Sequence, residues 1–158
     1  MGIRYMAYAF DPHQTEQALE RTVTVLCGYC AHEAWGARVL RRDEDTLDLD
    51  KAWSDLQRAA APAEYEPARP AFRMFEGEPT WTDRGHLPWM RALAPAEVPA
   101  IAEDLVVLDD AAVARRVVQR HGERGPEYAA YTLDHLQSAR SFVAALAHTG
   151  RGMVYTIG

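Results

Sequence analysis

The fold of this chain is decided by the stretch Leu47-Asp48-Leu49-Asp50-Lys51-Ala52-Trp53-Ser54-Asp55-Leu56. Its first residues alternate, with the leucines facing one way and the aspartates the other, as in a strand buried on one face. Asp50 is placed to cap a helix that follows, and in that helix Trp53 and Leu56 share a face because they are three positions apart. The pattern predicts a strand, a turn and a helix that Trp53 anchors on the core.

Longer segments extend this pattern into a complete domain. Residues Ile3 to Phe10 are almost entirely apolar on both alternating faces, which predicts an interior strand that is covered on both sides. From about Pro126, apolar residues recur at three- and four-residue steps until Thr149-Gly150, which predicts a long helix with a glycine cap. The alternation over Met153 to Ile157 predicts a last strand.

Shorter segments give four more expectations. Asp11-Pro12-His13-Gln14 has the cap, the proline and the later glutamine of a helix start. Phe72 to Phe75 is expected to be a short strand, and Pro95 to Leu108 has helical apolar spacing. Asp109 or Asp110 can cap a further helix. We therefore expect a single α+β domain over residues 1–158, in which several helices pack on a small mixed or antiparallel sheet that includes the N- and C-terminal strands.

The same landmarks resemble the YfbM-like family of bacterial proteins of unknown function, also called domain-of-unknown-function family eighteen-seventy-seven. The resemblance covers nearly the whole chain, and its most specific part is the run Asp50-Lys51-x-Trp53. The other matches are the Met1-Gly2 start with the strand to Phe10, the helix opening Leu93 to Val98, and the last helix and strand. The resemblance implies the fold, and it implies no activity because the family has none established.

This chain departs from the family pattern at Gln57. Family members often carry a histidine there, just after the leucine that follows the tryptophan. The departure counts against carrying over a catalytic histidine.

Length, composition and charge exclude several classes of protein. With 158 residues, 48% of them hydrophobic, the chain suits one globular domain. Its net charge of -6 would repel a phosphate backbone, which disfavours nucleic acid as a partner. No segment approaches the ~18 uninterrupted apolar residues of a membrane span, and the amino terminus has no basic leader. We therefore expect a cytoplasmic protein with no membrane partner.

The longest segment without periodicity runs from Glu76 to His86, and long irregular loops are disproportionately functional. One hypothesis is a small-molecule hydrolase, because carboxylates beside an imidazole can share proton transfer. Its candidate catalytic residues are His86, Glu76, Glu78 and Asp83. The other hypothesis is a binding surface, with candidate residues Trp81, Arg84 and Trp89. The alternative without a function is a solvated acidic loop whose tryptophans are buried in the core.

Cys27-Gly28-Tyr29-Cys30 has the spacing of a thiol redox site, which is a third hypothesis. No complete βαβ pattern surrounds it, and small buried cysteines are the alternative. Adding His32 gives three possible ligands where a structural zinc ion needs four, so we expect no metal ion and no cofactor.

The function that these observations favour is a non-catalytic binding or protein-interaction module that uses the segment Glu76 to Trp89. Its partner is an unidentified protein or small molecule, and nothing in the sequence indicates an oligomeric state. The hydrolase hypothesis predicts a concave pocket in which His86 approaches a carboxylate. The interaction hypothesis predicts a flat or convex surface with Trp81 or Trp89 exposed.

Overall fold

The structure is a computed structural model that describes residues 2–20, 22 and 43–158. Its elements, in chain order, are β1 (Tyr5–Phe10), η1 (Pro12–Gln14), α1 (Thr15–Glu20), η3 (Asp43–Asp45), β2 (Thr46–Asp50), α4 (Trp53–Ala60), η4 (Pro70–Met74), β3 (Thr80–Thr82), β4 (Gly85–Leu87), β5 (Trp89–Leu93), α5 (Val98–Val107), α6 (Asp110–His121), η5 (Gly122–Arg124), α7 (Gly125–Thr149) and β6 (Gly152–Ile157). Within the described ranges, none of these helices is long and apolar enough to cross a membrane.

The first and last strands lie side by side in the middle of an antiparallel sheet whose order is β2-β1-β6-β5. Tyr5 is paired with Ile157, and Phe10 with Gly152. Strand β1 is an interior strand, because β2 and β6 flank it. Its side chains are apolar on both faces because each face of the sheet is covered by a hydrophobic cluster. The predicted α+β class, and a sheet that includes both terminal strands, are confirmed.

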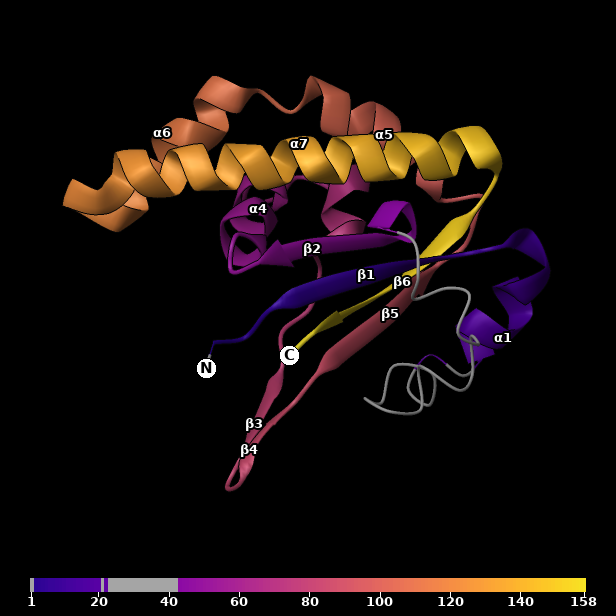
Figure 1. Cartoon of the computed structure of the whole chain (residues 1–158). Coiled ribbons are helices and arrows are strands. Elements are labelled where there is room, and N and C mark those ends of the chain that lie inside the picture. Colours follow the sequence, from indigo (N-terminus) through magenta and orange to yellow (C-terminus); the bar gives the residue numbers. More distant parts are fainter. Residues whose placement is uncertain (1, 21, 23–42) are drawn as a thin grey trace.

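The two faces of the sheet are covered unequally. The main core lies between one face and helices α4, α5, α6 and α7, and Figure 1 shows α7 running along the sheet on that side. On the opposite face, Ala18 of α1 packs against Phe10 and Val154 in a smaller cluster. The main core therefore fixes η4, α4 and α7, whereas the hairpin of β3 and β4 contributes no residue to it.

Helix α7 agrees closely with its sequence pattern. It buries a stripe of apolar residues at three- and four-residue steps, and it stops at Gly150, whose φ of 67° is the left-handed conformation that glycine adopts without strain. Asp109 caps α6, because its side chain accepts hydrogen bonds from the backbone N–H groups of Ala111 and Ala112. The expected helix start after Asp11 is also present, as η1 and then α1.

The stretch Leu47 to Leu56 forms the expected strand and helix. Leu49 and Leu56 are fully buried, and Trp53 is 9% exposed, with its indole Nε1 donating to the backbone oxygen of Ile3 at 3.3 Å. One expectation is wrong: Asp50 does not cap the helix. Ala52 is the N-cap of α4, and Asp50 lies in a tight turn with a φ of 41°, where its side chain serves other partners.

Two further expectations need correction. Phe72 to Phe75 is not a strand, because Pro70 begins the short helix η4 and the N–H of Phe72 donates to the oxygen of Arg69 at 3.1 Å. The segment after Glu76 is not wholly irregular, since it contains the antiparallel hairpin of β3 and β4. Gly85, with a φ of 134°, follows the turn of this hairpin.

Candidate functional site

The hairpin of β3 and β4 projects away from the body of the domain (Figure 1). Every residue of both strands is exposed. Trp81 is 72% exposed and Leu87 is 61% exposed. A tryptophan this open to solvent is unusual, because the indole is the largest apolar side chain and is highly buried on average.

The hairpin presents different side chains on its two faces. Trp81 lies directly opposite His86, and their rings meet edge to face with centroids 5.7 Å apart. Leu87 lies opposite Thr80, so it is on the other face, because successive side chains of a strand alternate. The surface is therefore a convex projection with an apolar group on each side.

The base of the hairpin is held by a close contact between a glycine and a tryptophan. Gly77 has a φ of 114°, and a Cβ added there would collide with the indole of Trp89. Trp89 itself is 38% exposed and begins the edge strand β5. Glycine at position 77 thus permits both the turn of the backbone and the approach of the indole.

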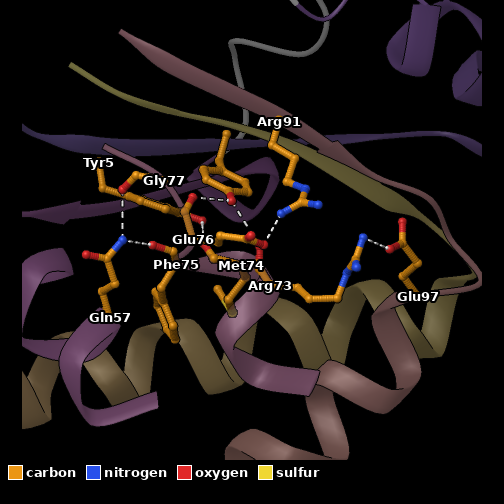
Figure 2. A network of polar contacts seen from close by, with 10 residues as sticks. Tyr5, Gln57, Arg73, Met74, Phe75, Glu76, Gly77, Arg91 and Glu97 are labelled. Atoms are coloured by element: carbon orange, nitrogen blue, oxygen red, sulfur yellow. Dashed lines mark hydrogen bonds and ion pairs between the residues drawn. The ribbon is translucent and has the colours of Figure 1, made fainter. Parts of the chain in front are cut away.

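A network of hydrogen bonds pins the backbone that precedes the hairpin to the sheet (Figure 2). The hydroxyl of Tyr155 lies within hydrogen-bond distance of the backbone oxygens of Arg73 and Glu76, at 2.9 and 2.8 Å, and these two acceptors share its single proton. The hydroxyl of Tyr5 donates to the oxygen of Met74 at 2.8 Å. Both tyrosines are fully buried. Burial raises the pKa of Tyr155 to about 12 and that of Tyr5 well above its ordinary value.

Gln57 completes this network from α4. Its side-chain Nε2 donates to the oxygen of Phe75 at 2.6 Å and to that of Gly77 at 2.8 Å. A primary amide suits this position because it offers two N–H donors to two backbone carbonyls. The residue that departs from the family pattern therefore holds the segment leading to the hairpin.

Charged pairs fix the same segment at its sides. Glu76 pairs with Arg91 of β5, and Arg73 pairs with Glu97 at 2.6 Å (Figure 2). The segment that enters η4 is tied to α5, because Asp104 binds Arg69 through two nitrogens at 2.7 and 2.8 Å. Hydrogen bonding to Arg69 holds the pKa of Asp104 below its ordinary value.

The structure does not bring the proposed hydrolase residues together. His86 is exposed in β4 with its ring against Trp81, and Glu76 is engaged by Arg91. Among the described residues, no hydrogen bond or ion pair joins His86 to Glu76, Glu78 or Asp83. Nor does any group of three or more His, Cys, Asp or Glu side chains in the described ranges have an arrangement that could hold a metal ion.

The remaining candidate residues are Arg84 and the two cysteines, Cys27 and Cys30. Arg84 is exposed at the tip of the hairpin, where its backbone N–H donates to the hydroxyl of Thr82 at 3.3 Å. Cys27 and Cys30 lie outside the described residues.

Sequence reasoning missed a second polar cluster, at the start of α7. The hydroxyl of Tyr131 donates to Asp50 Oδ2 at 2.7 Å, although 81 positions separate the two residues. Nearby, the ring of His121 stacks on Tyr128 at 4.2 Å and its Nε2 lies 3.0 Å from Asp55 Oδ2. The sequence signal for this cluster is the spacing of Tyr128 and Tyr131, which places both on one face of the helix, but the same spacing is typical of core residues.

The fold defines a class of small α+β domain, in which a four-stranded antiparallel sheet of order β2-β1-β6-β5 is crossed by one long helix. A solved structure of this class is "The Crystal Structure of a Protein of Unknown Function YfbM from Escherichia coli". The two chains are similar over 99% of each, with a TM-score of 0.64 and 19% sequence identity. This similarity agrees with the YfbM-like resemblance at the level of the fold.

The other comparisons found no relatives. No protein-family model matches the chain. No curated protein matches it either.

Proposed function

We propose that this chain is a non-catalytic protein-interaction module, and that a partner protein covers the hairpin of β3 and β4. The observation that carries the proposal is the exposure of Trp81 and Leu87 on opposite faces of a hairpin whose base is firmly held. A two-stranded hairpin is marginally stable by itself. Here the hairpin is supported at its base by the contact between Gly77 and Trp89 and by the hydrogen bonding of the Tyr155 hydroxyl.

The energetics of burial favour a protein partner. Covering the exposed part of the Trp81 indole would contribute on the order of 2–4 kcal/mol, which is the range of an interface hot spot. The charged residues Glu78, Asp83 and Arg84 surround the apolar groups and would form the polar rim that such interfaces have. A convex projection of this kind fits a groove on the partner.

The alternative function, a small-molecule hydrolase, has less support. It needs His86 beside a carboxylate, and the partner of His86 is the Trp81 ring. A thiol redox function depends on Cys27 and Cys30, which lie outside the described residues.

Site-specific photo-crosslinking tests the proposal. A photoreactive phenylalanine analogue is placed at position 81 or 87, and the chain is irradiated in its host cells. The matched control is position 107, because Val107 is an exposed apolar residue on α5, at 70% exposure. We expect one discrete crosslinked protein from both hairpin positions and none from the control.

Three outcomes would contradict the proposal. One is the same products from positions 81, 87 and 107, which would indicate random collisions. Another is no product from the hairpin. The third is a crosslink only to a second copy of this chain, which would assign the hairpin to self-association.

A further inference from the structure

A hollow of about 350 Å³ lies between the turn that joins β2 to α4 and the first turns of α7. Its lining residues are Asp50, Lys51, Arg124, Glu127, Tyr128 and Tyr131. The volume falls within the range of small-molecule sites. Two of the lining residues, Asp50 and Lys51, belong to the most specific part of the sequence signature.

Asp50 forms one wall of the hollow in a conformation that costs energy. Its φ of 41° lies in the left-handed region, which residues other than glycine adopt only at a cost. The carboxylate is positioned by the Tyr131 hydroxyl at 2.7 Å and by Arg4 Nε at 3.1 Å. The hydrogen bond from Tyr131 holds the pKa of Asp50 below its ordinary value, so this group is an anion at neutral pH.

Two aromatic rings form the opposite wall. Tyr128 and Tyr131 are three positions apart on α7, so they share a face. Each ring is held by a histidine: His121 stacks on Tyr128 at 4.2 Å, and His135 lies against Tyr131 at 4.3 Å. The Arg124 guanidinium also lies over the Tyr128 ring, with its Cζ 5.1 Å from the ring centroid, so the rings lie beside one of the two cations of the hollow.

The lining of the hollow carries charges of both signs, and Asp50 is also paired with Arg4 beside it. Asp50 and Glu127 supply two carboxylates, and Lys51 and Arg124 supply two cations. The pair of Arg124 and Glu127 is loose, since its nitrogen and oxygen are 3.5 Å apart and both side chains are about two-thirds exposed. A ligand with only positive or only negative charge would pair with only two of these four groups.

We propose that this hollow binds a small zwitterion, a free amino acid, with its ammonium toward Asp50 and Glu127 and its carboxylate toward Lys51 and Arg124. The tyrosine rings would cover the side chain of the ligand. Charge-assisted hydrogen bonds at both ends would fix its orientation. The site is separate from the hairpin and does not depend on the protein-interaction function.

Calorimetric titration tests this with four free amino acids as probes: leucine, phenylalanine, glutamate and lysine. We expect at least one to bind, and its methyl ester and its N-acetyl derivative each to bind at least tenfold more weakly. Absence of binding by all four overturns the proposal. So does a blocked derivative that binds as tightly as the free amino acid.

Variants assign the binding to the hollow. Asp50→Asn keeps the shape of the side chain and tolerates the left-handed backbone, and we expect it to lose affinity at least tenfold. Tyr65→Phe is the control, because Tyr65 is almost fully exposed in a loop. Unchanged affinity in Asp50→Asn overturns the assignment, and urea unfolding of both variants excludes a general loss of structure.

A third variant separates binding from stability. Asp50→Gly removes the carboxylate and suits the left-handed backbone, so we expect binding to be lost while the chain still unfolds cooperatively in urea. Unaltered binding in this variant would contradict the proposal. Hairpin crosslinks should be unaffected in all of these variants, which distinguishes failure here from failure of the interaction function.

Discussion

Replacing Tyr155 by phenylalanine removes a hydroxyl whose single proton is shared by two backbone carbonyls, those of Arg73 and Glu76. A net hydrogen bond contributes roughly 0.5–1.5 kcal/mol, and a buried acceptor left unpaired costs about 1–3 kcal/mol. We therefore expect Tyr155→Phe to lower the free energy of unfolding by about 1–3 kcal/mol. The ring itself stays, so packing in the sheet is retained.

The assay is urea unfolding at neutral pH, with two comparison variants. Tyr5→Phe loses a single hydrogen bond, to Met74, and is expected to cost about 1–1.5 kcal/mol. Tyr8→Phe is the control: Tyr8 is half-buried on the other face of the sheet, and its hydroxyl bonds to no residue in the described part of the chain. If Tyr155→Phe is no more destabilising than Tyr8→Phe, the network does not support the hairpin as argued.

The other predictions concern pH, an ion pair and a glycine. The free energy of unfolding should fall as pH rises from about 10 to 12, because Tyr155 and Tyr5 ionise at higher pH in the folded chain than in the unfolded chain. The expected fall is up to ~1.4 kcal/mol per pH unit for each tyrosine. Urea unfolding at a series of pH values checks this, and a slope unchanged by Tyr155→Phe would contradict it. Asp104→Asn should cost about 1–3 kcal/mol at pH 7, because the carboxylate serves Arg69 and a backbone N–H. The folded-state pKa of Asp104 is lowered, so this contribution is present above the unfolded pKa near 4 and is lost as pH falls through the folded-state pKa; a difference from wild type that does not shrink as pH falls below about 4 would count against it. Gly77→Ala should displace the indole of Trp89 and speed hydrogen exchange of the amides of residues 80–87 at least tenfold, while exchange in α7 stays unchanged. Equal exchange in the variant and the wild type would show that the contact between Gly77 and Trp89 does not hold the hairpin.

Local periodicity predicted the parts of the fold that bury one face of a regular element. Apolar spacing alone predicted α7 and β6, and the alternation before Trp53 predicted a strand and helix. These predictions succeeded because residues at a fixed spacing within a helix or strand lie on the same face, so apolar residues at that spacing indicate which face is buried. Asp109 likewise caps a helix through neighbours two and three positions away.

Distant contacts decided the features that the sequence did not predict. Asp50 resembled a helix cap, but its carboxylate binds Tyr131, 81 positions along the chain. Phe72 to Phe75 has the composition of a strand, yet Pro70 and the distant hydroxyl of Tyr155 favour a short helix there. A local sequence pattern does not indicate which residues 81 or 82 positions away will be hydrogen-bond partners.

The candidate surface was only partly predictable. The segment from Glu76 onward stood out because it lacked periodicity, and its tryptophans were the natural anchors. Whether Trp81 is buried or exposed depends on whether other elements cover the hairpin, which a single strand cannot indicate. A glycine within Asp83-Arg84-Gly85 was a turn signal that would have predicted the hairpin.

Hydroxyl-radical footprinting tests most directly whether a partner covers the hairpin. The rate of oxidation at Trp81 is measured in host cells and in the purified protein, with the exposed Tyr65 as an internal reference. The account predicts that Trp81 is several-fold less reactive in cells while Tyr65 is unchanged. Equal reactivity of Trp81 in both settings would contradict it.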